Sequence, residues 1–98
     1  MKNFRTYQLA KELYQECQKI KLKNIVIRDQ FERASLSIVL NLAEGSAKPT
    51  AKDRRKFYRI ALGSLREVQC ILEITNNKEL FQRADILGAH LYQLCTKT

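Results

Sequence analysis

The sequence predicts an all-α protein, an antiparallel up-and-down four-helix bundle that occupies residues 1–98 as a single domain. Three observations predict this fold. Apolar residues recur at spacings of three and four in four successive segments, short polar breaks separate these segments, and no segment alternates as a strand does. A hydrophobic content of 45%, with one proline and three glycines, is typical of a folded helical protein and not of a disordered one.

The first helix is expected over about residues 4–20. Its apolar face repeats at helical intervals and consists of Tyr7, Ala10, Leu13, Tyr14, Cys17 and Ile20. The pattern stops over residues 21–24, which indicates a connection. Either Asn24 or Asp29 can cap the second helix, because both residue types accept a hydrogen bond from the first helical turn.

The second helix contains residues 33–45, whose apolar side chains surround most of the helical cylinder. Polar side chains interrupt them at helical spacings and form a ladder: Arg33, Ser37, Asn41 and Glu44. Because a helix apolar on most sides is normally buried, we expect this helix to be central, with its ladder bonded to neighbouring helices. It should end between residues 45 and 48, with Gly45 as its C-terminal cap and Pro49 preventing continuation.

Two further helices complete the expected bundle. Thr50 and Asp53 form a suitable N-capping pair for the third helix, which should extend to about Thr75. Two asparagines and a lysine then mark a break. The last helix should run from near Glu79 to Thr96, where apolar residues alternate spacings of four and three, as in the seam of a bundle.

Antiparallel packing of the second and third helices predicts how their polar residues pair. With a short turn near Lys48, facing residues should have numbers that sum to roughly 97. This places Arg33 near Ser64 and Glu67. We therefore expect Arg33 and Glu67 to form a partly buried ion pair, with Ser64 and Gln30 available for hydrogen bonds.

Gly63 interrupts the third helix, where a glycine costs about 1 kcal/mol relative to alanine. We interpret it as a packing residue that lets two helices approach closely, together with Ala34 and Ala61. No G-x-G-x-x-G or Walker pattern is present in the sequence, so the glycine does not indicate a phosphate-binding loop.

A basic cluster opens the third helix in a chain whose net charge is +8. It comprises seven positive residues: Lys48, Lys52, Arg54, Arg55, Lys56, Arg59 and Arg66. Asp53 is the one acidic residue among them. Because positive charge at a helix N-terminus opposes the helix dipole, we interpret the cluster as a phosphate-binding surface; a solvated helix face is the alternative. No base-reading motif accompanies it, so contacts independent of nucleic-acid sequence are expected.

The sequence argues against an enzyme, a metal site and a cofactor. His90 is the only histidine, and it lies in the last helix, apart from any obvious nucleophile or set of metal ligands. Cys17, Cys70 and Cys95 are odd in number and widely spaced, so buried free thiols in a reducing compartment are expected. Without a signal peptide or a long apolar run, the sequence predicts a cytoplasmic protein that does not enter a membrane.

Three motifs on the second and third helices resemble those of a known family. They are Arg33-Ala34-x-x-Ser37-Ile38, Asn41-Leu42-Ala43-Glu44-Gly45 and Ala61-x-Gly63-Ser64-x-x-Glu67. They are similar to motifs of a four-helix bundle family that includes proteins encoded by intervening sequences within 23S ribosomal RNA genes. The family also includes the accessory variability determinant of diversity-generating retroelements. The resemblance extends from about Phe4 to Cys95.

The resemblance implies a homopentameric ring in the cytoplasm that binds RNA or a ribonucleoprotein. It implies roles in structure and assembly, and none in catalysis, for Arg33, Ser37, Asn41, Glu44, Gly45, Gly63, Ser64 and Glu67. Together with the basic cluster, it predicts a non-catalytic oligomeric module that binds nucleic acid. The alternative is a ring-forming scaffold that binds a protein partner, such as a reverse transcriptase, without direct contact to RNA.

Overall fold

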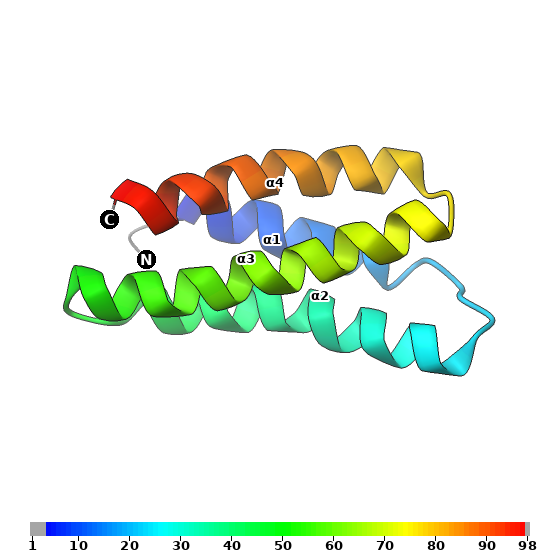
Figure 1. Cartoon of the computed structure of the whole chain (residues 1–98), viewed down its shortest axis with the longest axis horizontal. Helices are drawn as coiled ribbons and strands as arrows, with labels where there is room; N and C mark the ends of the chain where they lie inside the picture. The colour runs from blue at the N-terminus through cyan, green and yellow to red at the C-terminus, as the bar shows by residue number, and fades with distance from the viewer. Residues whose placement is uncertain (1–3, 98) are drawn as a thin grey trace.

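The computed structural model describes residues 4–97, which form four α-helices (Figure 1). These are α1 (Phe4–Cys17), α2 (Ile25–Ser46), α3 (Ala51–Ile74) and α4 (Lys78–Lys97). The helices lie side by side in a bundle that measures 42 × 21 × 18 Å, and successive helices run in opposite directions. Helices α1 and α3 both pack against α2 and α4, whereas diagonal pairs do not pack together. The predicted up-and-down four-helix bundle is therefore confirmed.

The connection between α1 and α2 begins earlier than the apolar pattern predicts. α1 ends at Cys17 and not at Ile20, because the backbone tightens into turns in which the Ile20 N–H donates to the Cys17 carbonyl at 3.2 Å. Asn24 then caps α2, since its side-chain oxygen accepts a hydrogen bond from the Ile27 N–H at 3.0 Å. The N-cap of α2 is therefore Asn24 and not Asp29.

The turn between α2 and α3 gives Gly45 a different role from the predicted C-terminal cap. α2 continues through Gly45 to Ser46, and Gly45 has ordinary helical geometry without a positive φ angle. The cap is Ala47, whose N–H donates to the Glu44 carbonyl at 3.2 Å. Thr50 caps α3 as predicted, because its hydroxyl accepts from the N–H of residue 53 at 3.2 Å.

The core collects apolar side chains from all four helices. The largest fully buried ones are Tyr58, Ile38, Leu42, Leu65, Leu72, Leu87, Leu91 and Val68. Ala10 and Leu13 add the contribution of α1. Each fully buried aliphatic side chain of this kind contributes about 1.5–3 kcal/mol, so burial along these stripes is the main source of stability.

The prediction that α2 is the central helix of the bundle is wrong. α2 packs only against α1 and α3, and it turns an apolar side toward solvent. Leu36 is 40% exposed and Leu40 is 57% exposed. In an up-and-down bundle each helix has two neighbours, so the additional apolar residues of α2 remain on the outside of the chain.

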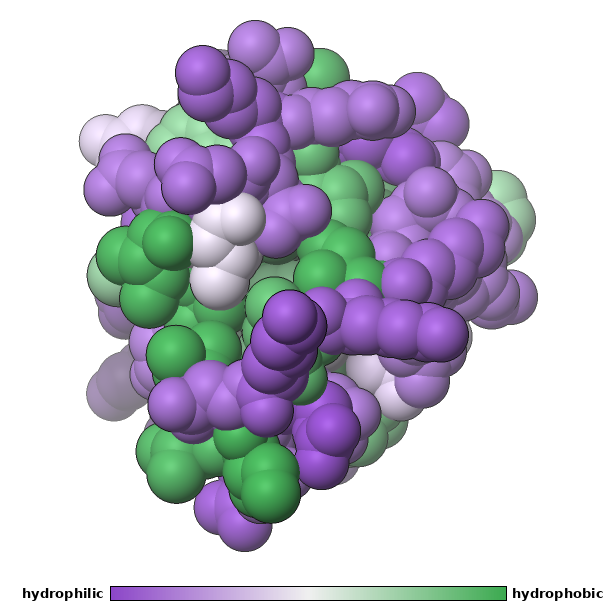
Figure 2. Space-filling view, turned by 90° about the vertical axis from the view of Figure 1, so that its right-hand side faces the viewer, coloured by the Kyte–Doolittle hydropathy of each residue, from purple (hydrophilic) through white to green (hydrophobic). Residues whose placement is uncertain are grey.

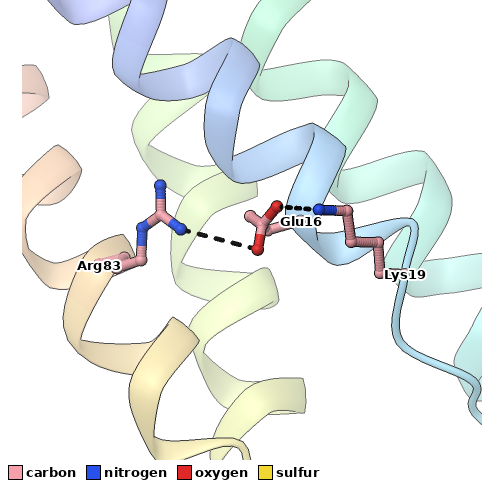
Figure 3. A network of polar contacts seen from close by, with 3 residues as sticks. All are labelled: Glu16, Lys19 and Arg83. Atoms are coloured by element: carbon pink, nitrogen blue, oxygen red, sulfur yellow. Dashed lines mark hydrogen bonds and ion pairs between the residues drawn. The ribbon is translucent and has the colours of Figure 1, made fainter.

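The helices α1 and α4 are linked by charge at one end of the bundle. The Glu16 carboxylate lies between Lys19 Nζ at 2.7 Å and Arg83 Nη1 at 3.8 Å (Figure 3). The hydrogen bond and charge of Lys19, with a smaller effect of Arg83, lower the pKa of Glu16. These are surface contacts, and exposed ion pairs add little to the free energy of unfolding.

The three cysteines are free thiols, but they do not share one environment. Cys17 and Cys95 are buried, whereas Cys70 is exposed, which corrects the prediction that all three are buried. Burial raises the pKa of Cys17 to about 12, so this thiol stays protonated at neutral pH. Cys70 lies on the outer side of α3, where no neighbouring helix covers it.

Candidate nucleic-acid interface

Neutral hydrogen bonds join α2 to α3. The hydroxyl oxygens of Ser37 and Ser64 lie 2.8 Å apart. The Asn41 amide donates to the Ser37 carbonyl at 2.9 Å and to its hydroxyl at 3.0 Å. These three motif residues therefore form one half-buried network along the α2–α3 seam, in which the two hydroxyl groups and the Asn41 amide nitrogen have partners, as burial requires.

The expected ion pair between Arg33 and Glu67 does not form. Glu67 instead accepts a hydrogen bond from the Gln30 amide at 2.7 Å. Arg33 is exposed, and among residues 4–97 no ion pair joins it to Glu67. Gln30 and Ser37 lie two helical turns apart on the same side of α2, whereas Arg33 is rotated outward, where its charge stays hydrated.

The prediction that Gly63 allows a close approach of two helices is wrong, and two other glycines have that role. A Cβ atom added at Gly63 would meet nothing within 4 Å, so this glycine lies on an open surface and does not allow a close contact between helices. At Gly45 the added atom would lie 2.8 Å from Tyr58 Cε1, and at Gly88 it would lie 3.3 Å from Arg66 Nη1. Gly45 and Gly88 are therefore the residues that admit close neighbours.

Two members of the basic cluster hold the turn between α2 and α3. Lys48 lies 3.3 Å from the Glu44 carboxylate and 5.1 Å above the centre of the Phe57 ring. Arg54 donates to the backbone carbonyls of Lys48, at 3.2 Å, and Pro49, at 3.0 Å. These intramolecular contacts engage Lys48 and one nitrogen of the Arg54 guanidinium, while Arg54 Nε is buried without a hydrogen-bond partner among residues 4–97. The first role of the two side chains is therefore to fix the turn.

Three other members of the cluster extend into solvent along the first half of α3. Lys52, Lys56 and Arg59 are exposed, while Arg55 is half-buried. Burial raises the pKa of the Cys95 thiol, and the charge of nearby Arg59 partly opposes that effect. Because α3 and α4 run antiparallel, Arg59 in the first half of α3 lies level with the last turns of α4, and the exposed cations occupy the end of the bundle nearest the α2–α3 turn.

Arg66 lies two turns further along α3, over the seam with α4. Its Nη1 donates to the Gln69 side-chain oxygen at 2.6 Å, and the Gln69 amide donates to Asp85 of α4 at 3.3 Å. Gly88 leaves room for the guanidinium group. This network was not predicted from the sequence, although Gly88 follows Ala84 by four residues and precedes Leu91 by three, which places it on the buried side of α4.

The opposite end of the bundle has a different surface. In Figure 2, which views that end, hydrophobic side chains reach the surface among polar ones. Ile25 and Val26 of α2 and Ile74 of α3 are exposed there. A groove of about 290 Å³ lies beside the α3–α4 turn, with Leu72 and Phe81 in its lining. The exposed cations Lys52, Lys56 and Arg59 lie toward the other end of α3.

The fold and this surface define a small helical-bundle protein with a basic end and no helix within residues 4–97 that could cross a membrane. Residues 2–97 match the model of the 23S rRNA-intervening sequence protein family, and the chain belongs to that family. Comparisons with curated proteins and with solved structures gave no significant match.

Proposed function

We propose that the protein is a non-catalytic module that binds RNA or a ribonucleoprotein in the cytoplasm through the exposed cations of α3. The observation that carries this proposal is the exposure of Lys52, Lys56 and Arg59, three cations grouped near a turn and largely separate from acidic residues. Such a group attracts phosphate oxygens and releases counterions when it binds. The family's name, which refers to 23S rRNA, supports RNA as the first ligand to test.

The experiment measures binding to a single-stranded RNA at several salt concentrations. One variant replaces Lys52, Lys56 and Arg59 by glutamine. A matched control replaces Lys21, Lys23 and Arg28, which are also exposed and lie at the opposite end of the bundle. Both variants lose three positive charges, so a difference between them reports the position of the charges and not the net charge.

The proposal expects the α3 variant to bind RNA at least about tenfold more weakly than the control at 100 mM salt, because each lost phosphate contact weakens binding. Both variants should keep their helical circular dichroism and cooperative unfolding. Equal RNA affinity of the two variants would remove the α3 surface as the binding site. Absence of RNA binding by the native protein would favour the scaffold that binds a protein partner.

We also propose that the chain assembles into a homopentameric ring through the outer side of the α2–α3 pair. The hydrogen bond between Ser37 and Ser64 sets the register of the two helices. Leu40, about one turn beyond Ser37 on α2, and Ile60, about one turn before Ser64 on α3, are 57% and 45% exposed. Exposed apolar side chains in register on neighbouring helices are typical of a surface that another subunit covers.

Light scattering tests the assembly with charged substitutions. The native chain should have the mass of five 11.4 kDa subunits, and Leu40→Glu should release monomers or smaller species. Ile86→Glu is the matched control, because Ile86 is also 57% exposed but lies on the outer side of α4. A monomeric native protein, or equal effects of the two substitutions, would contradict the proposed interface.

A further inference from the structure

An exposed aromatic residue lies on α4 beside the arginines of α3. Tyr92 is 59% exposed, although tyrosine is a residue type that is usually at least partly covered. It follows Gly88 by one helical turn and precedes Cys95 by three residues. Residues at these spacings share one side of a helix, so Tyr92 belongs to the side of α4 that borders α3.

One contact and the antiparallel packing of α3 and α4 fix which part of α3 Tyr92 faces. Gly88 lies against the Arg66 guanidinium, as shown by the 3.3 Å that would separate an added Cβ from Arg66 Nη1. Cys95 lies within the electrostatic influence of Arg59. Because α3 and α4 are antiparallel, Tyr92 must lie between the levels of Arg66 and Arg59 along the seam.

We infer that Tyr92, Arg59 and Arg66 form a stacking site for an unpaired base of single-stranded nucleic acid. The two arginines are two turns apart, which is about 10 Å along the helix axis. Their guanidinium groups can contact phosphates on either side of a nucleotide whose base lies on the tyrosine ring. A duplex keeps its bases stacked inside and cannot use the ring in this way. The inference rests on the nucleic-acid binding proposed above and specifies its preferred form.

The surroundings of the site favour an anion over an apolar partner. Lys52 and Arg59 extend the positive surface toward the α2–α3 turn, and both are exposed. Asp85 marks the opposite limit of the site, because it accepts from the Gln69 amide that orients Arg66. A strand bound here would therefore pass from the Arg66 end, across Tyr92, toward the exposed cations at the start of α3.

Binding titrations with a poly-uridine oligonucleotide and with a duplex of equal length test the site. Tyr92→Ala should weaken binding of the single strand about fivefold or more, the range found when a stacking aromatic is removed. Tyr92→Phe keeps the ring and should bind within about twofold of the native protein. Ile86→Ala is the control, since Ile86 has almost the same exposure on the same helix. Duplex binding should be nearly equal in all four proteins.

A second readout uses the absence of tryptophan from the chain. Tyr92→Trp introduces a single tryptophan, whose fluorescence should be quenched when the oligonucleotide binds. The same substitution at Ile86 should show no such quenching. If the native protein binds the single strand and Tyr92→Ala binds it equally well, the stacking site is wrong while the basic surface stands. Equal losses for single strand and duplex would also contradict stacking. If the native protein binds neither ligand, the proposed function itself fails.

Discussion

Helix α3 takes part in two seams of opposite character. Toward α2 it half-buries neutral groups, with Ser64 bonded to Ser37, and within residues 4–97 no ion pair joins the two helices. Toward α4 it places Arg66 over a glycine and connects it through Gln69 to Asp85. The first seam joins hydroxyl and amide groups at its half-buried part and holds one exposed carboxylate, Glu67, through the Gln30 amide. The second seam keeps guanidinium and carboxylate groups at the surface.

This difference follows from the energetics of burial. A neutral hydroxyl pair loses little when it leaves water if both partners are satisfied, but a charged group loses much more. The α2–α3 seam can therefore be closed and fix the register of the bundle. The α3–α4 seam keeps its charges hydrated, and it is the side on which a charged ligand can bind.

The largest expected effect comes from adding a methyl group to the closed seam. Gly45→Ala would place its Cβ 2.8 Å from Tyr58 Cε1 and 3.0 Å from Phe57 Cβ. Tyr58 is fully buried and cannot move aside, so we expect a loss of about 1–3 kcal/mol in the free energy of unfolding. Urea denaturation measures this loss. Gly88→Ala is the comparison variant at the α3–α4 seam. The Arg66 side chain can shift there, so this substitution should lower the free energy of unfolding less than Gly45→Ala does. Equal losses would show that the two seams do not differ in packing.

Removing the serine pair tests whether its hydrogen bond holds the closed seam. Ser37→Ala and Ser64→Ala should each lower the free energy of unfolding by about 1 kcal/mol, because the partner hydroxyl is left half-buried. The double variant should lose less than the sum of the two, by about 0.5 kcal/mol or more, since the residues are in contact. Simple additivity in this double-mutant cycle is the outcome that would argue against the hydrogen bond.

Gly63→Ala should stabilise the protein, in contrast to substitutions at either seam, because Gly63 lies on the outer surface of α3. Nothing lies within 4 Å of the added Cβ, and alanine favours a helix over glycine by up to about 1 kcal/mol. Thermal unfolding at a concentration where the chain is monomeric measures the gain. A decrease in melting temperature there would restore the interpretation of Gly63 as a residue for close packing within the bundle.

The smallest change is expected for Arg33→Ala. Arg33 is exposed and makes no ion pair with Glu67, so the free energy of unfolding should change by less than about 0.5 kcal/mol. Glu67→Gln is the companion variant, because glutamine can still accept from the Gln30 amide. A loss of about 3 kcal/mol in either variant would indicate the buried ion pair that the structure lacks.

The sequence is sufficient to predict the number, order and approximate limits of the helices, because apolar spacing and capping residues are local signals. It also identifies Ser37, Asn41 and Ser64 as polar groups that need partners. Which groups pair depends on helix rotation and on the length of the α2–α3 turn, and neither is a local property. For this reason Gln30, and not Arg33, reaches Glu67.

The same dependence on helix rotation and packing explains why the sequence does not predict the roles of the glycines and of the basic cluster. The helical pattern reveals that Gly63 weakens α3, but not that its side of the helix faces solvent. The cluster of cations is visible in the sequence, whereas the use of Arg54 to bind backbone carbonyls of the turn is not. Tyr92 becomes a candidate binding residue only when the packing of α4 against α3 brings it level with Arg59 and Arg66.

The central claim is that the exposed cations of α3 bind phosphates, and the salt dependence of RNA affinity tests it most directly. Each phosphate contact contributes about 0.7 to the slope of log affinity against log salt for a single strand. Replacing Lys52, Lys56 and Arg59 by glutamine should therefore reduce the slope by up to about 2, whereas the control at Lys21, Lys23 and Arg28 should leave it unchanged. Identical slopes for the α3 variant and the native protein would contradict the claim.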